Sequence, residues 1–165
     1  MGYWGYLVVG RSERPLAEAK ALAGAPGLEL LKTAPDGWQV WAYRSGEGDV
    51  GNMLTLAQET GAPALFGYVM DSDCVVVEAA APESGAWTTC LARGAMAGYL
   101  GEDGLTVDDY FLEPADAAER AVAWAAESGQ SVEAGPLRAV LTADPDPLAE
   151  NLFYDFLDRL GVVPL

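Results

Sequence analysis

Two aspartates stand two positions apart in the segment Asp71-Ser72-Asp73, between two stretches of β-forming residues. Carboxylate oxygens are the ligands that Mg²⁺ and Mn²⁺ prefer, so such a pair could hold a divalent ion. Asp and Ser are also standard turn formers, because their short polar side chains bond to the neighbouring backbone. The spacing therefore predicts a turn at 71–73, and a carboxylate- or metal-dependent enzyme using Asp71 and Asp73 stays open as an alternative.

A second group of acids follows in the segment 101–113, where polar residues between isolated aromatic ones indicate a loop. Aromatic side chains next to acids are favourable anchors for a protein–protein interface. Together with the two aspartates of the 71–73 turn, this group forms the predicted contact surface for a basic protein. Its members are Glu102, Asp103, Asp108, Asp109 and Tyr110.

The chain contains no histidine. This absence removes the Ser–His and Cys–His nucleophile pairs, histidine metal sites and the commonest general base. The sequence also lacks a phosphate-binding P-loop, a dinucleotide-binding glycine pattern and a Cys-x-x-Cys motif. We therefore predict a protein that is not an enzyme and that carries neither a metal ion nor an organic cofactor.

Charge is the most informative property of the composition. The chain has 25 acidic and 9 basic residues, which gives a net charge of −16 at pH 7, and residues 51–165 contribute −15 of it. Such a field repels nucleic acids and anionic membranes and attracts cationic partners. Acidity can also serve solubility alone, and this alternative stays open.

Cys74 and Cys90 are the only cysteines, too few for a disulfide framework in a chain of 165 residues. We expect buried free thiols, although Cys74 follows the 71–73 turn closely enough to be accessible. No stretch reaches the roughly 18 apolar residues of a membrane span. The first residues lack the basic region and cleavage site of a signal peptide. We expect a cytoplasmic protein without a membrane partner.

Stretches rich in aromatic and β-branched residues, separated by turn residues, predict the strands that would position these side chains. Pro35-Asp36-Gly37 and the 71–73 turn should each close a hairpin. Tyr3 and Tyr6, like Trp38 and Trp41, are an odd number of residues apart, so the members of each pair should face opposite sides of a sheet. The strand expected at 3–9 is apolar on both faces and should therefore be central. The other expected strands are 28–32, 38–43, 64–70, 74–79 and 87–92, and for 87–92 a first helical turn stays open as an alternative.

Capping residues and apolar periodicity predict the helices. The last helix has the widest apolar stripe, between Leu148 and Leu160. The expected helices and their capping residues are 12–23 (Ser12), 50–60 (Asp49 and Gly61), 93–100 (Gly101), 114–128 (Pro114 and Gly129) and 147–160 (Asp146, Pro147 and Gly161).

Hairpins in the middle of the chain imply an α+β fold. We expect a single layer of mostly antiparallel sheet packed against several helices, with a helical C-terminal part. One domain should span 1–165, in which 1–100 contains the sheet and 114–161 forms the helical part packed on it.

The leading functional hypothesis is an acidic, non-enzymatic protein that captures a basic protein partner. The most natural case is a bacterial immunity or antitoxin-type inhibitor that neutralises a basic toxin domain, such as a nuclease. Nuclease sites are positively charged because they hold phosphates, and a carboxylate-rich surface would accelerate association with them. Besides the metal-dependent enzyme, a small-molecule sensor with an aromatic pocket and an assembly or scaffold role stay open.

Overall fold

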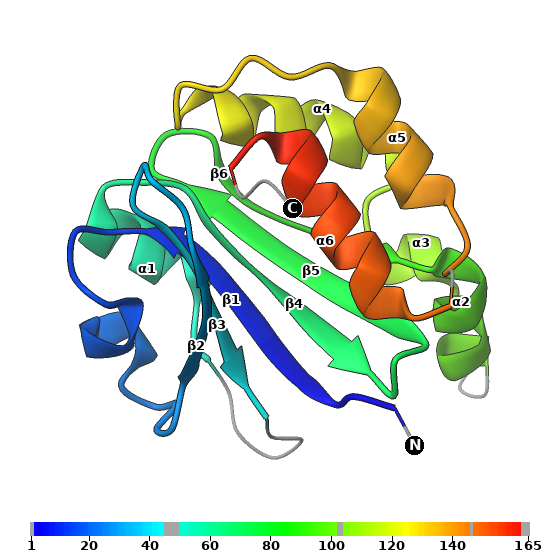
Figure 1. The fold of residues 1–165 in the computed structure, drawn as a ribbon. Coiled ribbons are helices and arrows are strands. Elements are labelled where there is room, and N and C mark those ends of the chain that lie inside the picture. The colour runs from blue at the N-terminus through cyan, green and yellow to red at the C-terminus, as the bar shows by residue number, and fades with distance from the viewer. Residues whose placement is uncertain (1, 45–49, 102–103, 146, 163–165) are drawn as a thin grey trace.

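The computed structural model describes residues 2–44, 50–101, 104–145 and 147–162. They form an α+β fold around one six-stranded sheet in which all neighbouring strands are antiparallel (Figure 1), as predicted. The strands in their spatial order are β2 (Glu29–Thr33), β3 (Trp38–Tyr43), β1 (Gly5–Arg11), β4 (Ala64–Met70), β5 (Cys74–Ala81) and β6 (Gly85–Leu91).

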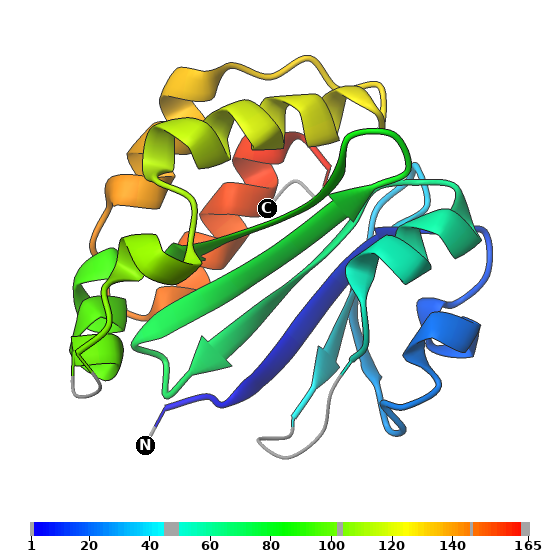
Figure 2. The same cartoon turned by 180° about the vertical axis from the view of Figure 1, so that it is seen from behind.

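Helices pack on both faces of this sheet. The face that we call the helical face packs against α4 (Pro114–Ala126), α5 (Ala134–Thr142) and α6 (Ala149–Leu160). The opposite face, which we call the open face, packs against α1 (Met53–Thr60) and a segment of 3₁₀ turns near residue 20. Two more helices, α2 (Arg93–Gly101) and α3 (Val107–Tyr110), lie beside the ends of β5 and β6 (Figures 1 and 2).

The aromatic pairs divide between the two faces as predicted, although β1 begins at Gly5 and not at Tyr3, so alternation within a strand applies only to the tryptophan pair. Trp38 packs in the core of the helical face and Trp41 in the core of the open face, and both are buried. Tyr3 packs on the helical side and Tyr6 on the open side. β1 lies between β3 and β4, so the strand predicted to be central is central.

The predicted helix over 12–23 is wrong, because this segment forms two 3₁₀ turns, at Leu16–Glu18 and Lys20–Leu22. Side chains of other elements bind the backbone groups that an α-helix would have used. The Gln39 side chain accepts a hydrogen bond from Leu16 N at 2.8 Å, and the Glu59 carboxylate accepts one from Lys20 N at 2.9 Å. Ser12 caps no helix, because its hydroxyl accepts a local bond from Arg14 N instead.

Two predicted helix starts also differ from the structure. α1 begins at Met53, where the Asn52 side chain accepts from Leu54 N at 2.8 Å, and the predicted cap Asp49 lies outside the described residues. α6 begins at Ala149, so Pro147 is not helical, and the predicted cap Asp146 is likewise not described.

The helix ends follow the predicted chemistry more closely. Gly61 and Gly161 both adopt the left-handed conformation at a helix C-terminus, with φ of 72° and 77°. Pro114 is the first residue of α4, where a missing N–H costs nothing. No helix among the described residues is long and apolar enough to cross a membrane.

Two helices were not predicted at all. α3 lies inside the segment 101–113 that was expected to be a loop, and α5 occupies a stretch that had no assignment. α5 has Gly135 and Pro136 in its first turn. Proline is tolerated at that position, but in a sequence the Gly-Pro pair resembles a helix break. Its buried residues Leu137 and Leu141 show that tertiary packing stabilises it.

Candidate binding surface

The β4–β5 hairpin ends in a strained turn at Asp71 and Ser72. Their φ angles are 51° and 56°, a conformation in which residues other than glycine are held only by their surroundings. The chain's first residues provide those contacts. Gly2 N donates to the Asp71 carboxylate at 2.7 Å, and Tyr3 N donates to the Ser72 hydroxyl at 2.8 Å.

Ser72 also joins this turn to the start of α6. Its carbonyl accepts from Ala149 N at 2.9 Å, and its hydroxyl donates to the Glu150 carboxylate at 2.9 Å. The hairpin turn therefore satisfies the N-terminus of α6, which explains why that helix begins later than its own sequence predicts. The predicted turn at 71–73 is confirmed. The contacts of this turn give the Asp71 carboxylate a structural role that requires no metal ion.

Asp73 connects the same turn to α2. The hydroxyl of Tyr99, an exposed residue of that helix, donates to the Asp73 carboxylate at 3.2 Å. Asp71 and Asp73 are thus held by different partners. Among the residues that the structure describes, no group of three or more Cys, Asp or Glu side chains could hold a metal ion.

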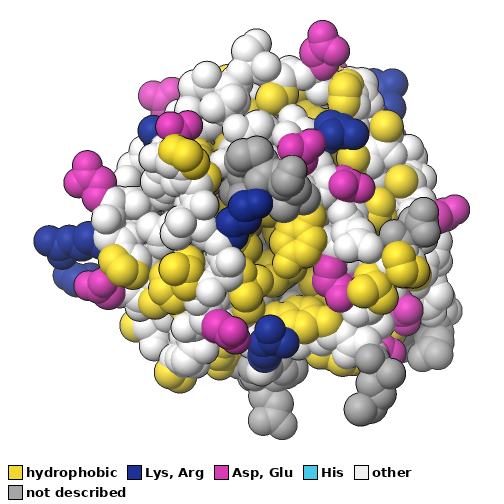
Figure 3. All heavy atoms as spheres, viewed as in Figure 1, with side chains coloured by type: hydrophobic (Ala, Val, Ile, Leu, Met, Phe, Trp, Pro, Cys, Tyr) yellow, Lys and Arg dark blue, Asp and Glu magenta, His cyan; other side chains and the backbone are white. Residues whose placement is uncertain are grey.

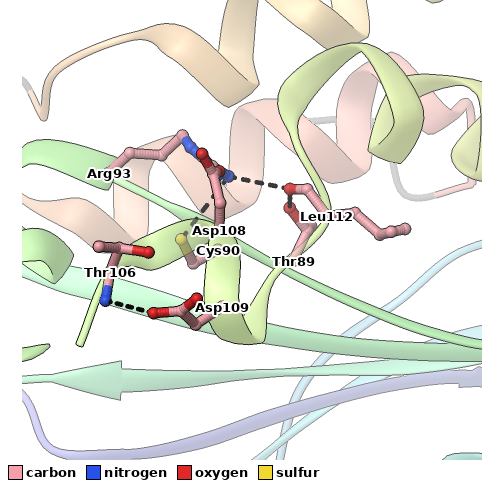
Figure 4. A network of polar contacts seen from close by, with 7 residues as sticks. All are labelled: Thr89, Cys90, Arg93, Thr106, Asp108, Asp109 and Leu112. Carbon is pink, nitrogen blue, oxygen red and sulfur yellow. Dashed lines mark hydrogen bonds and ion pairs between the residues drawn. The ribbon is translucent and has the colours of Figure 1, made fainter.

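The acids of α3 are also engaged within the molecule (Figure 4). Asp108 accepts a hydrogen bond from Arg93 at 3.1 Å, and Asp109 accepts one from Thr106 N at 2.9 Å. That bond from the Thr106 backbone lowers the pKa of Asp109. Arg93 also donates to the Leu112 carbonyl at 3.1 Å, so it fastens α3 and the chain after it onto α2.

The structure brings several of the predicted contact residues to one end of the molecule. The Asp73–Tyr99 bond joins the hairpin turn to α2, and the Arg93–Asp108 pair joins α2 to α3. Tyr110, at the end of α3, is 56% exposed. Glu102 and Asp103 lie outside the described residues. We call the turn 71–73, α2 and α3 the acidic end.

Carboxylates elsewhere serve as acceptors for backbone N–H groups. Glu59 accepts from Lys20 N and Ala21 N, and these bonds lower its pKa. Burial raises the pKa of Glu127, but hydrogen bonds from Ser84 and from the backbone of Glu83 outweigh this effect and leave the pKa below its normal value.

Figure 3 shows Asp and Glu side chains spread around the helical face. On this side of the molecule, the negative charge is not gathered into one patch.

A feature that sequence reasoning missed lies on the open face. On the part of the open face that lies between α1 and α2, no described helix covers the strands (Figure 2). Tyr43, Tyr6 and Tyr68 oppose one another across β3, β1 and β4, and all three are half-buried. Their ring centroids are 6.2 Å apart for Tyr43 and Tyr6 and 4.6 Å apart for Tyr6 and Tyr68. We call these three residues the tyrosine row.

Trp4 extends this aromatic surface toward the acidic end. Its side chain is 43% exposed, and its ring lies 6.5 Å from that of Tyr68. Trp4 is two residues from Gly2, whose N–H binds Asp71. Glu78, on β5 and opposite Phe66 of β4, adds an exposed carboxylate to the same face. The open face therefore combines part-exposed aromatic rings with negative charge.

The helical face carries a small pocket between α6 and the sheet. It has a volume of about 250 Å³ and is lined by apolar side chains such as Leu31 and by Tyr3, Arg44 and Tyr154. Burial raises the pKa of both tyrosines. The volume is below the range of roughly 300–1,000 Å³ that is usual for ligand pockets.

Both cysteines are buried free thiols, as expected for structural residues. Burial raises the pKa of Cys74 to about 12 and that of Cys90 to about 11. Cys74 is completely buried although it directly follows the 71–73 turn, so the alternative that this position is accessible does not apply. Such thiols are poor nucleophiles.

No protein-family model, curated protein or solved structure with which the chain was compared is significantly similar to it.

Proposed function

We propose that this protein is a non-enzymatic binding protein that forms an equimolar complex with a basic protein. The observation that carries the proposal is the helix-free strip of the open face, where the tyrosine row and Trp4 adjoin the acidic end. Aromatic side chains that are already held by their neighbours provide contact area at little entropic cost. The net charge of −16 favours a cationic partner.

In this proposal, charge and aromatic surface have separate tasks. Many of the described carboxylates already accept internal hydrogen bonds, and on the helical face they are dispersed. Dispersed charge accelerates the diffusional encounter with a basic partner but gives little affinity at any one point. Affinity would come from the aromatic rings, which cluster in one place.

The more specific form of the proposal is an immunity or antitoxin-type inhibitor from a bacterium, which neutralises a basic toxin domain such as a nuclease. A nuclease must present positive charge where it holds phosphates, and an acidic protein that covers this region would block substrate entry. No catalytic group of the inhibitor is needed for such an activity.

Capture followed by reconstitution tests the proposal. The protein is immobilised, basic proteins retained at about 50 mM salt are purified, and each is recombined with the free protein in an analytical ultracentrifuge. We expect one equimolar complex whose affinity falls steeply as salt is raised. Failure to retain any basic protein at low salt, or binding that is indifferent to salt, would contradict the proposal.

Matched substitutions then test which end of the molecule is involved. Asp73→Asn removes a charge at the acidic end, and Asp36→Asn removes one from the β2–β3 turn, at the opposite end of the sheet. Both variants have the same net charge. We expect slower association for Asp73→Asn than for Asp36→Asn. Equal rates would show that the partner does not approach the acidic end.

A further inference from the structure

The pocket between α6 and the sheet has apolar walls that reach the surface of the molecule. It lies beside the first two turns of α6, and residues of β1, β2 and β3 complete it. Leu7 and Ala42 line its buried part, and Leu31 and Leu148 line its mouth. The two residues at the mouth are 40% and 44% exposed. A small apolar ligand would therefore cover surface that the protein itself leaves in contact with water.

A β-bulge contributes one wall of this pocket. The register between β2 and β3 shifts between Leu30 and Lys32, so Leu31 is the extra residue of the bulge. Bulges recur next to active sites, where the extra residue re-aims a side chain. Leu31 lines the pocket from this irregular position.

Two opposite charges line the same pocket. They belong to Arg44 and Glu150, and no ion pair joins these two described side chains. Arg44 lies over the ring of Tyr3, 5.4 Å from its centre. Burial is the main cause of the raised pKa of Tyr3 and Tyr154, and the charges of Arg44 and Glu150 act on both hydroxyls as well. Both charges are therefore close to the same two hydroxyls.

Three polar groups of the pocket can still bind a ligand. The ion pair of Arg44 with Glu29 uses Nε at 3.4 Å and is exposed, so it contributes little, and a guanidinium has further N–H donors. Glu150 accepts the Ser72 hydrogen bond through Oε2, whereas its buried Oε1 receives none from the described residues. The Tyr154 hydroxyl likewise has no hydrogen-bond partner in the described part of the chain.

The volume and the two charges together select a small zwitterion. A water molecule takes up about 30 Å³, so a pocket of about 250 Å³ holds roughly eight non-hydrogen atoms. Valine and leucine are of this size. A ligand with a single charge would meet a like charge in the pocket, whereas an amino acid can place its carboxylate at Arg44 and its ammonium group at Glu150.

We propose that this pocket binds a free aliphatic α-amino acid of about the size of leucine. Its carboxylate lies at Arg44 and the Tyr154 hydroxyl, its ammonium group lies at Glu150, and its side chain packs on the leucines of the walls. This inference goes beyond the proposed function and does not depend on it, because the pocket is on the helical face and the tyrosine row is on the open face.

Isothermal titration calorimetry with three probes tests the class of ligand. L-leucine carries both charges, isocaproate lacks the ammonium group, and isoamylamine lacks the carboxylate. We expect L-leucine to bind in the micromolar to millimolar range, as ligands of this size do, and the other two to bind about tenfold more weakly or worse. The absence of binding heat with millimolar L-leucine, or equal affinity for L-leucine and isocaproate, would overturn the inference.

Substitutions place the amino acid in the pocket. Arg44→Gln should weaken the binding of L-leucine by about tenfold or more, whereas Arg138→Gln makes the same change on the exposed side of α5 and should have no effect. Glu150→Gln keeps an acceptor for the Ser72 hydroxyl. It should weaken the binding of L-leucine but tighten that of isocaproate, because the repulsion between two carboxylates is removed. Equal affinities of the two arginine variants, or weaker binding of both ligands to Glu150→Gln, would show that the amino acid does not bind as proposed.

Discussion

Gly67 of β4 lies against Phe153 of α6, and its replacement by alanine gives a sharp test of the core. A Cβ atom at this position would lie 2.6 Å from Cδ1 of Phe153 and 3.0 Å from Cγ1 of Val75. Both neighbours are completely buried, so neither side chain can move into solvent to make room. Gly67→Ala must therefore push α6 away from the sheet or force Phe153 from its rotamer.

The expected size of the effect is the difference between two opposing contributions. Overpacking a well-filled core costs about 1–3 kcal/mol. Alanine also restricts the unfolded chain, which offsets about 0.5–1 kcal/mol of that cost. We expect Gly67→Ala to lower the free energy of unfolding by up to about 2.5 kcal/mol.

Gly98→Ala is the matched control for this experiment. Gly98 is an exposed residue within α2, and a Cβ atom there would meet no atom within 4 Å. The same chemical change should therefore stabilise the protein by about 0.5–1 kcal/mol. Urea unfolding followed by tryptophan fluorescence would measure both variants, which should differ by about 1–3 kcal/mol. Equal stabilities for the two variants would refute the packing argument.

Four further predictions concern the other contacts. Ser72→Ala should lower the free energy of unfolding by about 2–4 kcal/mol, because it leaves the Glu150 carboxylate and the backbone N–H of Tyr3 without the hydroxyl that each of them bonds; urea unfolding measures this. Asn52→Ala should cost about 1 kcal/mol in the same assay through loss of the α1 cap. Cys74 should resist a thiol reagent at pH 8 until the protein unfolds, since burial raises its pKa to about 12. The folded-state pKa of Glu127 is lowered from 4.5, so its contribution to stability is complete above pH 4.5 and disappears as the pH falls through the folded-state value. The stability difference between wild type and Glu127→Gln, measured by urea unfolding at several pH values, should therefore shrink on acidification.

Elements that depend on local chemistry could be predicted from the sequence. The bounds of β3 and β4 match the prediction, and both predicted hairpin turns are present, because aspartate, serine, proline and glycine determine the turns through nearby backbone contacts. β6 is also a strand and gives way to α2 at Arg93, close to the predicted boundary. Long-range pairing was not needed to recognise any of these features.

Elements that depend on distant partners could not be predicted. The segment 12–23 has helical periodicity, but Gln39 and Glu59 compete for its backbone groups. The start of α6 is satisfied by Ser72, a residue 78 positions away from its bonded partner Glu150. In both cases a group from another element decides the local conformation, and the sequence pattern of the segment itself does not reveal that group.

The tyrosine row was beyond sequence reasoning for a related reason. Its three members are far apart in the chain, and they become neighbours only because β1 lies between β3 and β4. The available signal was the alternation that sends Tyr6 to the opposite face from Tyr3, but alternation does not reveal which face remains uncovered. The order of strands in the sheet, which no local pattern specifies, creates this surface.

The structure also changes what the excess of acidic residues means. Glu59, Glu127 and Asp109 each accept hydrogen bonds from backbone N–H groups in turns and short helices, which lowers their pKa and keeps them charged at neutral pH. A carboxylate that accepts such internal hydrogen bonds contributes to the net charge without forming part of an interface. The net charge of the chain therefore overestimates the acidity of any one contact surface. Surfaces such as the tyrosine row, where several side chains share one exposed face, indicate more about the partner.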